Sequence, residues 1–272
     1  MIQFFDEKHG FVATGDGLLR RTSDGGATWK GLSIPETKFS FIRFTDERRG
    51  LLMARVANGS AGQPDQLYAT EDAGDSWRRL PNPPASGWLI SLRGTSEAWL
   101  ASGGPEPPRA YRSIDGGLSW QRSEIPIDRV TTFAGPWTTS VILLPGEGVL
   151  AWVFCECSSP NGFMFTSFDG GATWRFVPDT LHPGLLSRRV VAYQDDFHWW
   201  FIEAKTLYRS ADAGQTWIKV SDQLPDWAFM PRAVDHNHGW AQIGANVGNF
   251  YGLAITNDAG LHWNRVTIPK LT

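Results

Sequence analysis

The amino-acid sequence predicts an all-β protein, a six-bladed β-propeller in which each blade is a four-stranded antiparallel sheet. One eight-residue pattern, Ser/Thr-x-Asp-x-Gly-x-x-Trp, occurs six times, and we call it the box. Its aspartates are separated by 48, 43, 54, 43 and 46 residues. Short strand-like runs flank every box, and helical periodicity is absent. A nearly constant period with about four strands per repeat is typical of propellers.

The box has a mechanical explanation, because each recurring residue type fixes a tight turn. An aspartate accepts hydrogen bonds from backbone N–H groups that follow it, and glycine supplies the positive φ that the turn needs. The tryptophan then covers the turn with a large apolar surface. Too few oxygen ligands stand at alternate positions for a calcium loop, so we expect no metal. The residues with this expected structural role are Asp24, Asp72, Asp115, Asp169, Asp212, Asp258, Trp29, Trp77, Trp120, Trp174, Trp217 and Trp263.

Composition limits the classes of function. The formal net charge is −3 with mixed charges, which disfavours nucleic acid as a partner. The apolar content of 42% fits a globular protein, and no apolar run is long enough to insert into a membrane. Two cysteines exclude a disulfide scaffold, and no motif calls for a cofactor. The segment Met1–Phe11 lacks the pattern of a signal peptide, which leaves export of a processed form open.

The repeats predict one propeller domain over residues 1–272, which we expect to be a monomer. The chain starts on the expected first strand of a blade, Ile2–Asp6, and ends on an expected fourth strand, Trp263–Ile268. Each terminus then completes its own blade. This arrangement is unusual for a propeller and leaves open that residues before Met1 were removed. A seventh blade stays open only if one degenerate repeat is hidden.

The boxes resemble the Asp-box (BNR) repeat of sialidase-like propellers. The longer phrase FFDEKHGFVATGDGLLRRTSDGGATW, residues 4–29, resembles the repeats of photosystem II assembly and stability factor-like propellers. The resemblance implies that each box joins the third and fourth strands of its blade, so all boxes share one face. The opposite face, the top face, is then the usual binding face. The function implied is a non-enzymatic scaffold that binds a protein partner or acidic peptide there.

Arginines form the first group of candidates for the top face. Aligning the expected first strands puts Gln3, Arg43 and Arg232 at one equivalent position in blades 1, 2 and 6, with Arg93 two residues later in blade 3. Grouped guanidinium ions bind carboxylates, phosphates or acidic peptides. The alternative is that these arginines are scattered over the surface. Further candidates, just before the first strand of blade 5, are Arg188 and Arg189.

Tryptophans form the second group, since the chain has 14 of them. Trp99, Trp152, Trp200 and Trp240 align with Phe11 in the expected second strands, which predicts core positions. Trp199, next to Trp200, is ambiguous between core and surface. Connections between blades hold three more. An exposed tryptophan commonly anchors a protein partner or a sugar ring, whereas the alternative is packing over a blade edge. These three candidates are Trp88, Trp137 and Trp227.

A glycan-binding or glycan-hydrolysing propeller is the alternative function. Resemblance to sialidases implies an arginine triad, a Tyr–Glu pair and an acidic proton donor, but the Arg-Ile-Pro signature is absent. Only Tyr193 and Tyr251 lie outside a repeated strand position. A glycosidase needs two facing carboxylates, and nothing pairs the acids of the expected top connectors. We therefore name no catalytic residue and expect a glycoside hydrolase if the chain is an enzyme. Those acids are Asp128, Asp179, Asp222 and Asp226.

The two cysteines, Cys155 and Cys157, fall on one face of an expected strand. Without further cysteines or a nearby histidine they make a poor metal site. Their spacing leaves a strained redox pair and packed thiols as alternatives.

Overall fold

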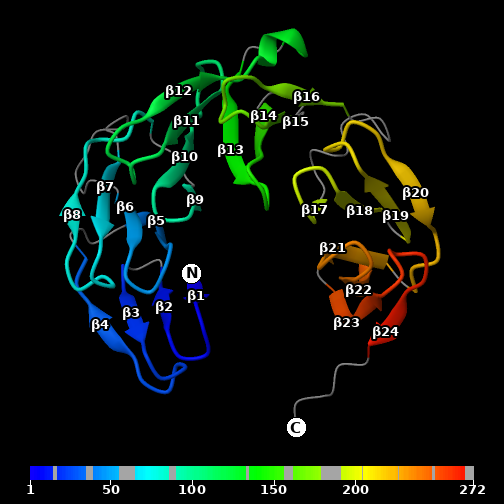
Figure 1. Ribbon diagram of the computed structural model, residues 1–272, viewed down its shortest axis with the longest axis horizontal. Helices are drawn as coiled ribbons and strands as arrows, with labels where there is room; N and C mark the ends of the chain where they lie inside the picture. The colour runs from blue at the N-terminus through cyan, green and yellow to red at the C-terminus, as the bar shows by residue number, and fades with distance from the viewer. Residues whose placement is uncertain are drawn as a thin grey trace. The chain divides into compact units, whose positions relative to one another are not determined.

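The computed structural model confirms the all-β prediction (Figure 1). It describes residues 1–14, 17–34, 39–54, 65–85, 90–132, 135–155, 162–178, 191–203, 205–225, 227–246 and 249–266. Within these ranges the strands form six four-stranded sheets, the blades of a six-bladed β-propeller. Neighbouring strands in a sheet follow one another along the chain and pair antiparallel, as the hairpin spacing of the repeats predicts.

The chain divides into two compact units, Met1–Val141 and Ile142–Thr272. The first unit contains three complete sheets. Their strands are β1 (Ile2–Phe4), β2 (Gly10–Ala13), β3 (Leu19–Thr22), β4 (Lys30–Leu32), β5 (Phe39–Phe44), β6 (Gly50–Ala54), β7 (Gln66–Thr70), β8 (Arg78–Arg79), β9 (Ser91–Arg93), β10 (Glu97–Ala101), β11 (Arg109–Ser113) and β12 (Gln121–Glu124).

A short 3₁₀ helix, η1 (Ile127–Arg129), follows the third sheet. The unit boundary falls inside β13, so the fourth sheet begins before it and the second unit completes it. The remaining strands are β13 (Trp137–Leu143), β14 (Val149–Cys155), β15 (Gly162–Ser167), β16 (Arg175–Val177), β17 (Val191–Tyr193), β18 (Trp199–Glu203), β19 (Thr206–Ser210), β20 (Ile218–Ser221), β21 (Trp227–Ala233), β22 (Gly239–Asn246), β23 (Asn249–Thr256) and β24 (Asn264–Val266).

Hydrophobic clusters join consecutive blades inside each unit. In the first unit, Phe11 of β2 stacks on Phe44 of β5 with ring centres 3.5 Å apart. In the second unit, Trp199 and Phe201 of β18 pack with Leu150 of β14. Such side chains interdigitate because both faces of a middle strand are covered.

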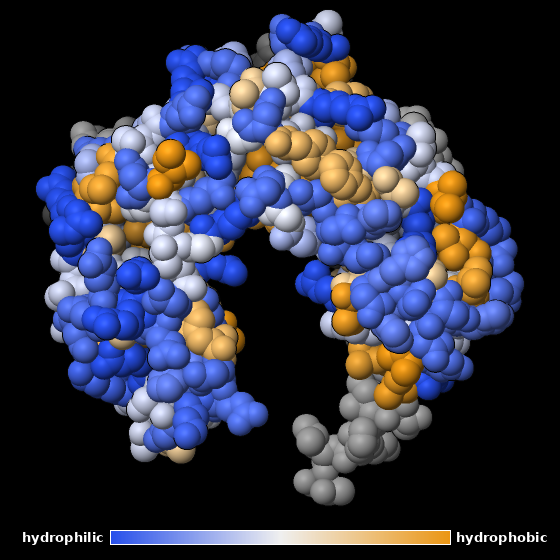
Figure 2. Space-filling view, viewed as in Figure 1, coloured by the Kyte–Doolittle hydropathy of each residue, from blue (hydrophilic) through white to orange (hydrophobic). Residues whose placement is uncertain are grey.

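The visible surface is largely hydrophilic with separate hydrophobic patches (Figure 2). No helix in the described part of the chain has the length and apolar character needed to cross a bilayer.

The middle strands overturn one predicted core position. We expected Trp152 to align with Phe11, which pairs with Arg21, three residues before the box aspartate. In the fourth blade the residue in that register is Leu150, which pairs with Thr166 and is 1% exposed. Trp152 lies two residues further along β14 and is 37% exposed. The alignment failed because this blade has a tryptophan out of register with the others. Trp99, Trp199 and Trp200 are fully buried.

Candidate functional site

All six boxes are hairpin turns between a third and a fourth strand, as predicted. In the first box, Thr22 Oγ1 donates to Asp24 Oδ1 at 2.8 Å, and the Gly26 N–H donates to Thr22 Oγ1 at 2.9 Å. Thr28 donates both its N–H and its hydroxyl to the Asp24 carboxylate, at 2.9 and 2.6 Å. These bonds, the Thr28 hydroxyl first, lower the pKa of Asp24 to about 2. Both carboxylate oxygens of Asp24 accept hydrogen bonds from within the turn, which supports the structural role of this aspartate.

The sequence pattern missed one member of the box, the residue just before the tryptophan. It is Thr or Ser in five boxes and His262 in the sixth. In each box its side chain contacts the second carboxylate oxygen, at 2.6 to 2.7 Å. The signal was present in the sequence as a recurring Ser/Thr-Trp pair.

A second family of aspartate turns, also unrecognised from the sequence, joins the first and second strands. Asp6 Oδ1 accepts from the Lys8 and His9 N–H groups, both at 2.7 Å, and Asp6 Oδ2 lies 2.8 Å from His9 Nδ1. The same Asp–His arrangement recurs at Asp195–His198 and Asp235–His238. These turns lie at the same end of the blades as the boxes, because Gly25 N donates to Lys8 O at 2.9 Å.

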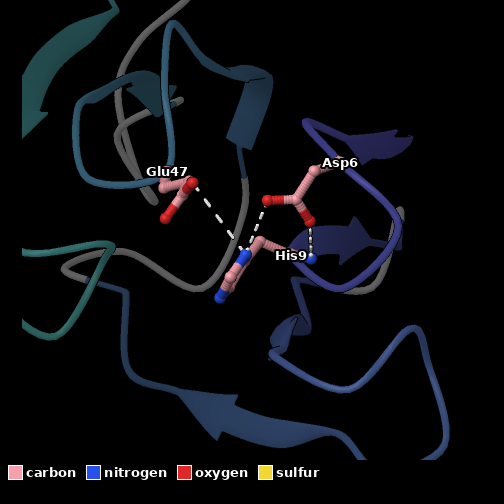
Figure 3. Close-up of side chains that lie close together, drawn as sticks. All are labelled: Asp6, His9 and Glu47. Atoms are coloured by element: carbon pink, nitrogen blue, oxygen red, sulfur yellow. Dashed lines mark hydrogen bonds and ion pairs between the residues drawn. The ribbon is translucent and has the colours of Figure 1, made fainter.

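One of these turns meets a carboxylate from the next blade (Figure 3). His9 Nδ1 faces Asp6 at 2.8 Å and Glu47, from the turn after β5, at 3.9 Å. The hydrogen bond from Asp6 raises the pKa of His9, and the same bond lowers the pKa of Asp6 to about 2. A protonated imidazole does not ligate metals. When His9 is protonated, the three side chains form an ion-pair cluster around its Nδ1.

Arginine links neighbouring boxes in both units. Arg21 of β3 donates from one terminal nitrogen to the Ala73 carbonyl of the next box at 3.0 Å. Arg209 of β19 donates in the same way to the Ala259 carbonyl at 3.3 Å, and its guanidinium carbon lies 4.9 Å from the Trp200 ring centre. Both arginines stand three residues before their own box aspartate. We call this arrangement the arginine clasp.

The register confirms the alignment of the candidate arginines on the first strands. Gln3, Arg43 and Arg232 pair with Phe11, Leu51 and Trp240. Arg43 and Arg232 are each the next-to-last residue of their strands, so their Cα atoms lie nearer the box end than the opposite end. We expected them at the top-face mouth instead. The difference arises because the first strands extend away from the box end beyond the aligned position.

The side chains of these first-strand residues differ in their partners. Gln3 bridges to the next blade, donating to Phe44 O at 2.7 Å and accepting from Phe44 N at 3.2 Å. The side chains of Arg43 and Arg232 are exposed and make no hydrogen bond or ion pair to the part of the chain that the structure describes. Arg93 is half-buried and bonds to Glu97 at 3.1 Å, so its charge is neutralised internally. Arg188 and Arg189 lie outside the described residues.

Of the three candidate tryptophans, Trp137 is the one whose side chain the structure describes. Trp137 is 4% exposed, and its backbone N–H and carbonyl each pair with Gly104 at 2.8 Å. It is therefore a packed residue and not an exposed anchor, and a β-bridge joins its backbone to the third blade. Trp227 begins β21, but its side chain, like all of Trp88, lies outside the described residues.

The residues considered under the glycosidase alternative show no activated catalytic group in the described part of the chain. Tyr193 is half-buried, and desolvation raises the pKa of its phenol, the opposite of activation. The Asp222 carboxylate binds Lys219 Nζ at 2.7 Å. Asp128 is exposed at η1, while Asp179, Asp226 and the Tyr251 side chain lie outside the described residues.

Cys155 forms a disulfide, so the alternative of packed free thiols is wrong. Cys157 lies outside the described residues.

Comparison with known proteins identifies related chains. Residues 1–125 match the family model described as Photosynthesis system II assembly factor YCF48. The photosystem II assembly lipoprotein Ycf48 of Prochlorococcus marinus is 35% identical over 283 residues, which cover 100% of this chain and 74% of that protein. A solved structure, YCF48 bound to D1 peptide, superposes with a TM-score of 0.63 at 22% identity, covering 97% of this chain and 80% of that one.

An enzyme is among the relatives. The oligoxyloglucan-reducing end-specific xyloglucanase of Emericella nidulans is 25% identical over 217 residues. The match covers 78% of this chain but only 25% of the enzyme.

Proposed function

Because the chain belongs to the YCF48 family of photosystem II assembly factors, we propose that it is a non-enzymatic scaffold that binds a protein partner during assembly of a larger complex. A homologue of 35% identity that spans the whole chain supports this function. In the solved YCF48 structure, the molecule bound to that protein is a D1 peptide. We propose a segment of the same kind, carrying carboxylates, as the partner of this chain.

One observation carries the choice of binding residues. Arg43 and Arg232 stand at equivalent first-strand positions, are exposed, and have no partner among the described residues. Arg43 lies between Ile42 and Phe44, which are 4% and 1% exposed. An arginine fixed on a strand by buried neighbours loses little backbone freedom when it binds. Charge-assisted bonds from its planar head to a carboxylate are roughly twice as strong as neutral ones.

A glycosidase function has less support. The relative that is an enzyme shares a quarter of its length with this chain. Asp222 is paired with Lys219, Asp128 is exposed, and Tyr193 is half-buried with a raised pKa. Hydrolysis needs two carboxyl groups at about 5 to 9.5 Å across a sugar site.

The experiment measures binding of a synthetic D1 peptide to the full chain by calorimetry. Arg43→Ala/Arg232→Ala should weaken binding at least tenfold, since each lost charge-assisted bond contributes about 1.5 to 3 kcal/mol. Arg20→Ala/Arg79→Ala is the matched control, because both residues are exposed strand arginines and the net charge changes equally. Equal affinity of the two double variants would remove the arginines from the binding site. Absence of binding to the unmodified chain would overturn the proposed function.

A further inference from the structure

Two grooves between blades hold a clasp arginine, and the groove between the second and third blades does not. Three residues before the box aspartate, β3 and β19 carry the clasp residues Arg21 and Arg209, whereas β7 carries Ala69. In the remaining strands the equivalent residues are Arg112, which bonds to Glu97 of its own blade, Thr166 and Ile255. A cleft of about 380 Å³ lies between these two blades, and Ala69 is one of its lining residues. An arginine at this position would extend into that cleft, as it does toward the following box in the other two cases.

The far wall of the cleft repeats the receiving end of the clasp. The carbonyls that accept from the clasp belong to Ala73 and Ala259, at φ 60° and 63°, and their counterpart Gly116 has φ 71°. Gly116 N donates to Ser96 O at 2.8 Å, as Ala73 N donates to Arg48 O at 2.7 Å. The Gly116 carbonyl therefore has the same backbone setting. It accepts no hydrogen bond from the described residues.

The other walls suit a long side chain with a charged head. Leu51 and Leu92 line the cleft and offer an apolar surface to a methylene stem. Glu71 and the hydroxyls of Thr95 and Ser96 line it as well and can accept hydrogen bonds.

The charged side chains that line this cleft limit which ligands it can bind. Its aspartate, Asp115, is already bonded within its box, and Glu97 is paired with Arg112 at 2.9 Å. Of the two lining arginines, Arg49 is held by Asp46 at 3.4 Å, and Arg78 is exposed on β8, where it pairs with Ala69 of β7. Glu71 is then the carboxylate left to meet a cation.

We propose that this cleft binds an arginine side chain presented on the surface of a protein partner, at the position equivalent to that of Arg21 in the groove between the first and second blades. The incoming guanidinium donates to the Gly116 carbonyl and to Glu71, and its stem lies over Leu51. The site is at the box end of the first unit, involves neither Arg43 nor Arg232, and does not depend on the D1-like partner.

The test uses the tripeptide Ac-Gly-Arg-Gly-NH₂ and the full isotope-labelled chain, observed by amide NMR. We expect saturable shifts at millimolar peptide, centred on the Gly116, Ser96 and Leu92 amides. The matched citrulline tripeptide, neutral but of the same shape, should give no saturable shift there. Equal shifts with the citrulline peptide, or arginine shifts centred elsewhere, would overturn the proposal.

Two substitutions at Ala69 test the site by comparison with the clasp position of the other repeats. Ala69→Arg supplies the clasp from within and should abolish the shifts at Gly116, while Ala69→Ser leaves the cleft open and should preserve them. If the Ala69→Arg chain does not fold, Arg21→Ala gives a second reading, because it opens the counterpart groove. That variant should show an added set of saturable shifts centred on Ala73. Unchanged binding by folded Ala69→Arg, or no added site in Arg21→Ala, contradicts the assignment.

Discussion

The carboxylate of Asp196 accepts a hydrogen bond from the backbone N–H of Gly146 at 2.9 Å, across 50 residues of sequence. The same carboxylate accepts from the next two N–H groups, of Glu147 and Gly148, at 2.9 and 3.0 Å. The turn after β13 thus has three donors satisfied by a residue of the next blade. This contact lies in the second unit and joins the turn after β13 to the turn after β17.

Replacing Asp196 should therefore destabilise the second unit. Asp196→Ala leaves three N–H groups without their acceptor, and we expect a loss of about 1 to 3 kcal/mol in the free energy of unfolding. Asp222→Ala removes an exposed ion pair with Lys219 and should change that free energy much less, because solvent screens the pair. Urea unfolding followed by circular dichroism measures both. Indistinguishable midpoints for the two variants would show that the Asp196 contact contributes nothing.

Three boxes hold alanine in the left-handed region, and this predicts opposite effects of two substitutions. Ala259 has φ 63°, a conformation that costs an L-residue about 1 to 2 kcal/mol. Ala259→Gly should stabilise the chain by about 0.5 kcal/mol, because the relieved strain exceeds the entropy cost of glycine, about 0.5 to 1 kcal/mol.

The reverse change at Gly25, φ 74°, should destabilise the chain. A Cβ there would lie 2.8 Å from the Glu7 carbonyl oxygen, so strain and a clash add together. Gly116→Ala is the milder comparison, since its Cβ would meet only the Thr95 carbonyl at 3.7 Å. Thermal melts should rank Gly25→Ala below Gly116→Ala and both below the unmodified chain. A higher melting temperature for Gly25→Ala would contradict the turn geometry.

The box aspartates predict acid sensitivity in a defined window. Hydrogen bonds from the residue four positions on lower the pKa to about 2 for Asp24, Asp72, Asp115, Asp169 and Asp258, against 3.8 in an unfolded chain. Between these values the unfolded chain binds more protons, so stability rises with pH there. It is complete above pH 3.8 and is lost as the pH falls toward 2.

Melting temperature measured from about pH 5 to pH 2 checks this window. Asp24→Asn should show a flatter profile than the unmodified chain, since one titrating group with a lowered pKa is gone. A profile of unchanged slope would mean that the Asp24 carboxylate does not titrate as its hydrogen bonds require.

The cluster of Asp6, His9 and Glu47 predicts a histidine with a pKa above 6.5. The folded-state pKa is raised, so the pairing stabilises the fold at low pH and is lost as the pH rises through that pKa. NMR titration of the His9 ring measures it. Asp6→Asn should bring the pKa down further than Glu47→Gln, because Asp6 lies at 2.8 Å and Glu47 at 3.9 Å. The reverse order would contradict the arrangement in Figure 3.

The repeats sufficed to predict the blades, because the box is a local turn whose hydrogen bonds lie within a few residues of each other. The same logic failed for Trp152, since register depends on pairing with β15, and residue type alone aligned it with Phe11. For Trp137 the sequence left an exposed anchor and a packed residue open, and the structure shows a packed residue, 4% exposed, whose backbone bridges to Gly104 of the preceding blade.

The candidate site was only partly accessible to sequence reasoning. Sequence alignment of the first strands correctly placed Gln3, Arg43 and Arg232 at one equivalent position, because each residue stands a fixed distance before its turn. Whether an arginine is neutralised is a tertiary property, and only the structure distinguishes exposed Arg43 from Arg93, which binds Glu97. The arginine clasp was missed for the same reason, as its acceptor lies one blade away.

The central claim is that this chain binds a partner's carboxylates. Its most direct test compares two forms of one D1 peptide, the natural acid and a version with every carboxylate converted to amide, binding to the full chain at low salt. We predict an affinity at least tenfold lower for the amide form, with the difference shrinking as salt is added. Equal affinity for the two forms at low salt would contradict the account.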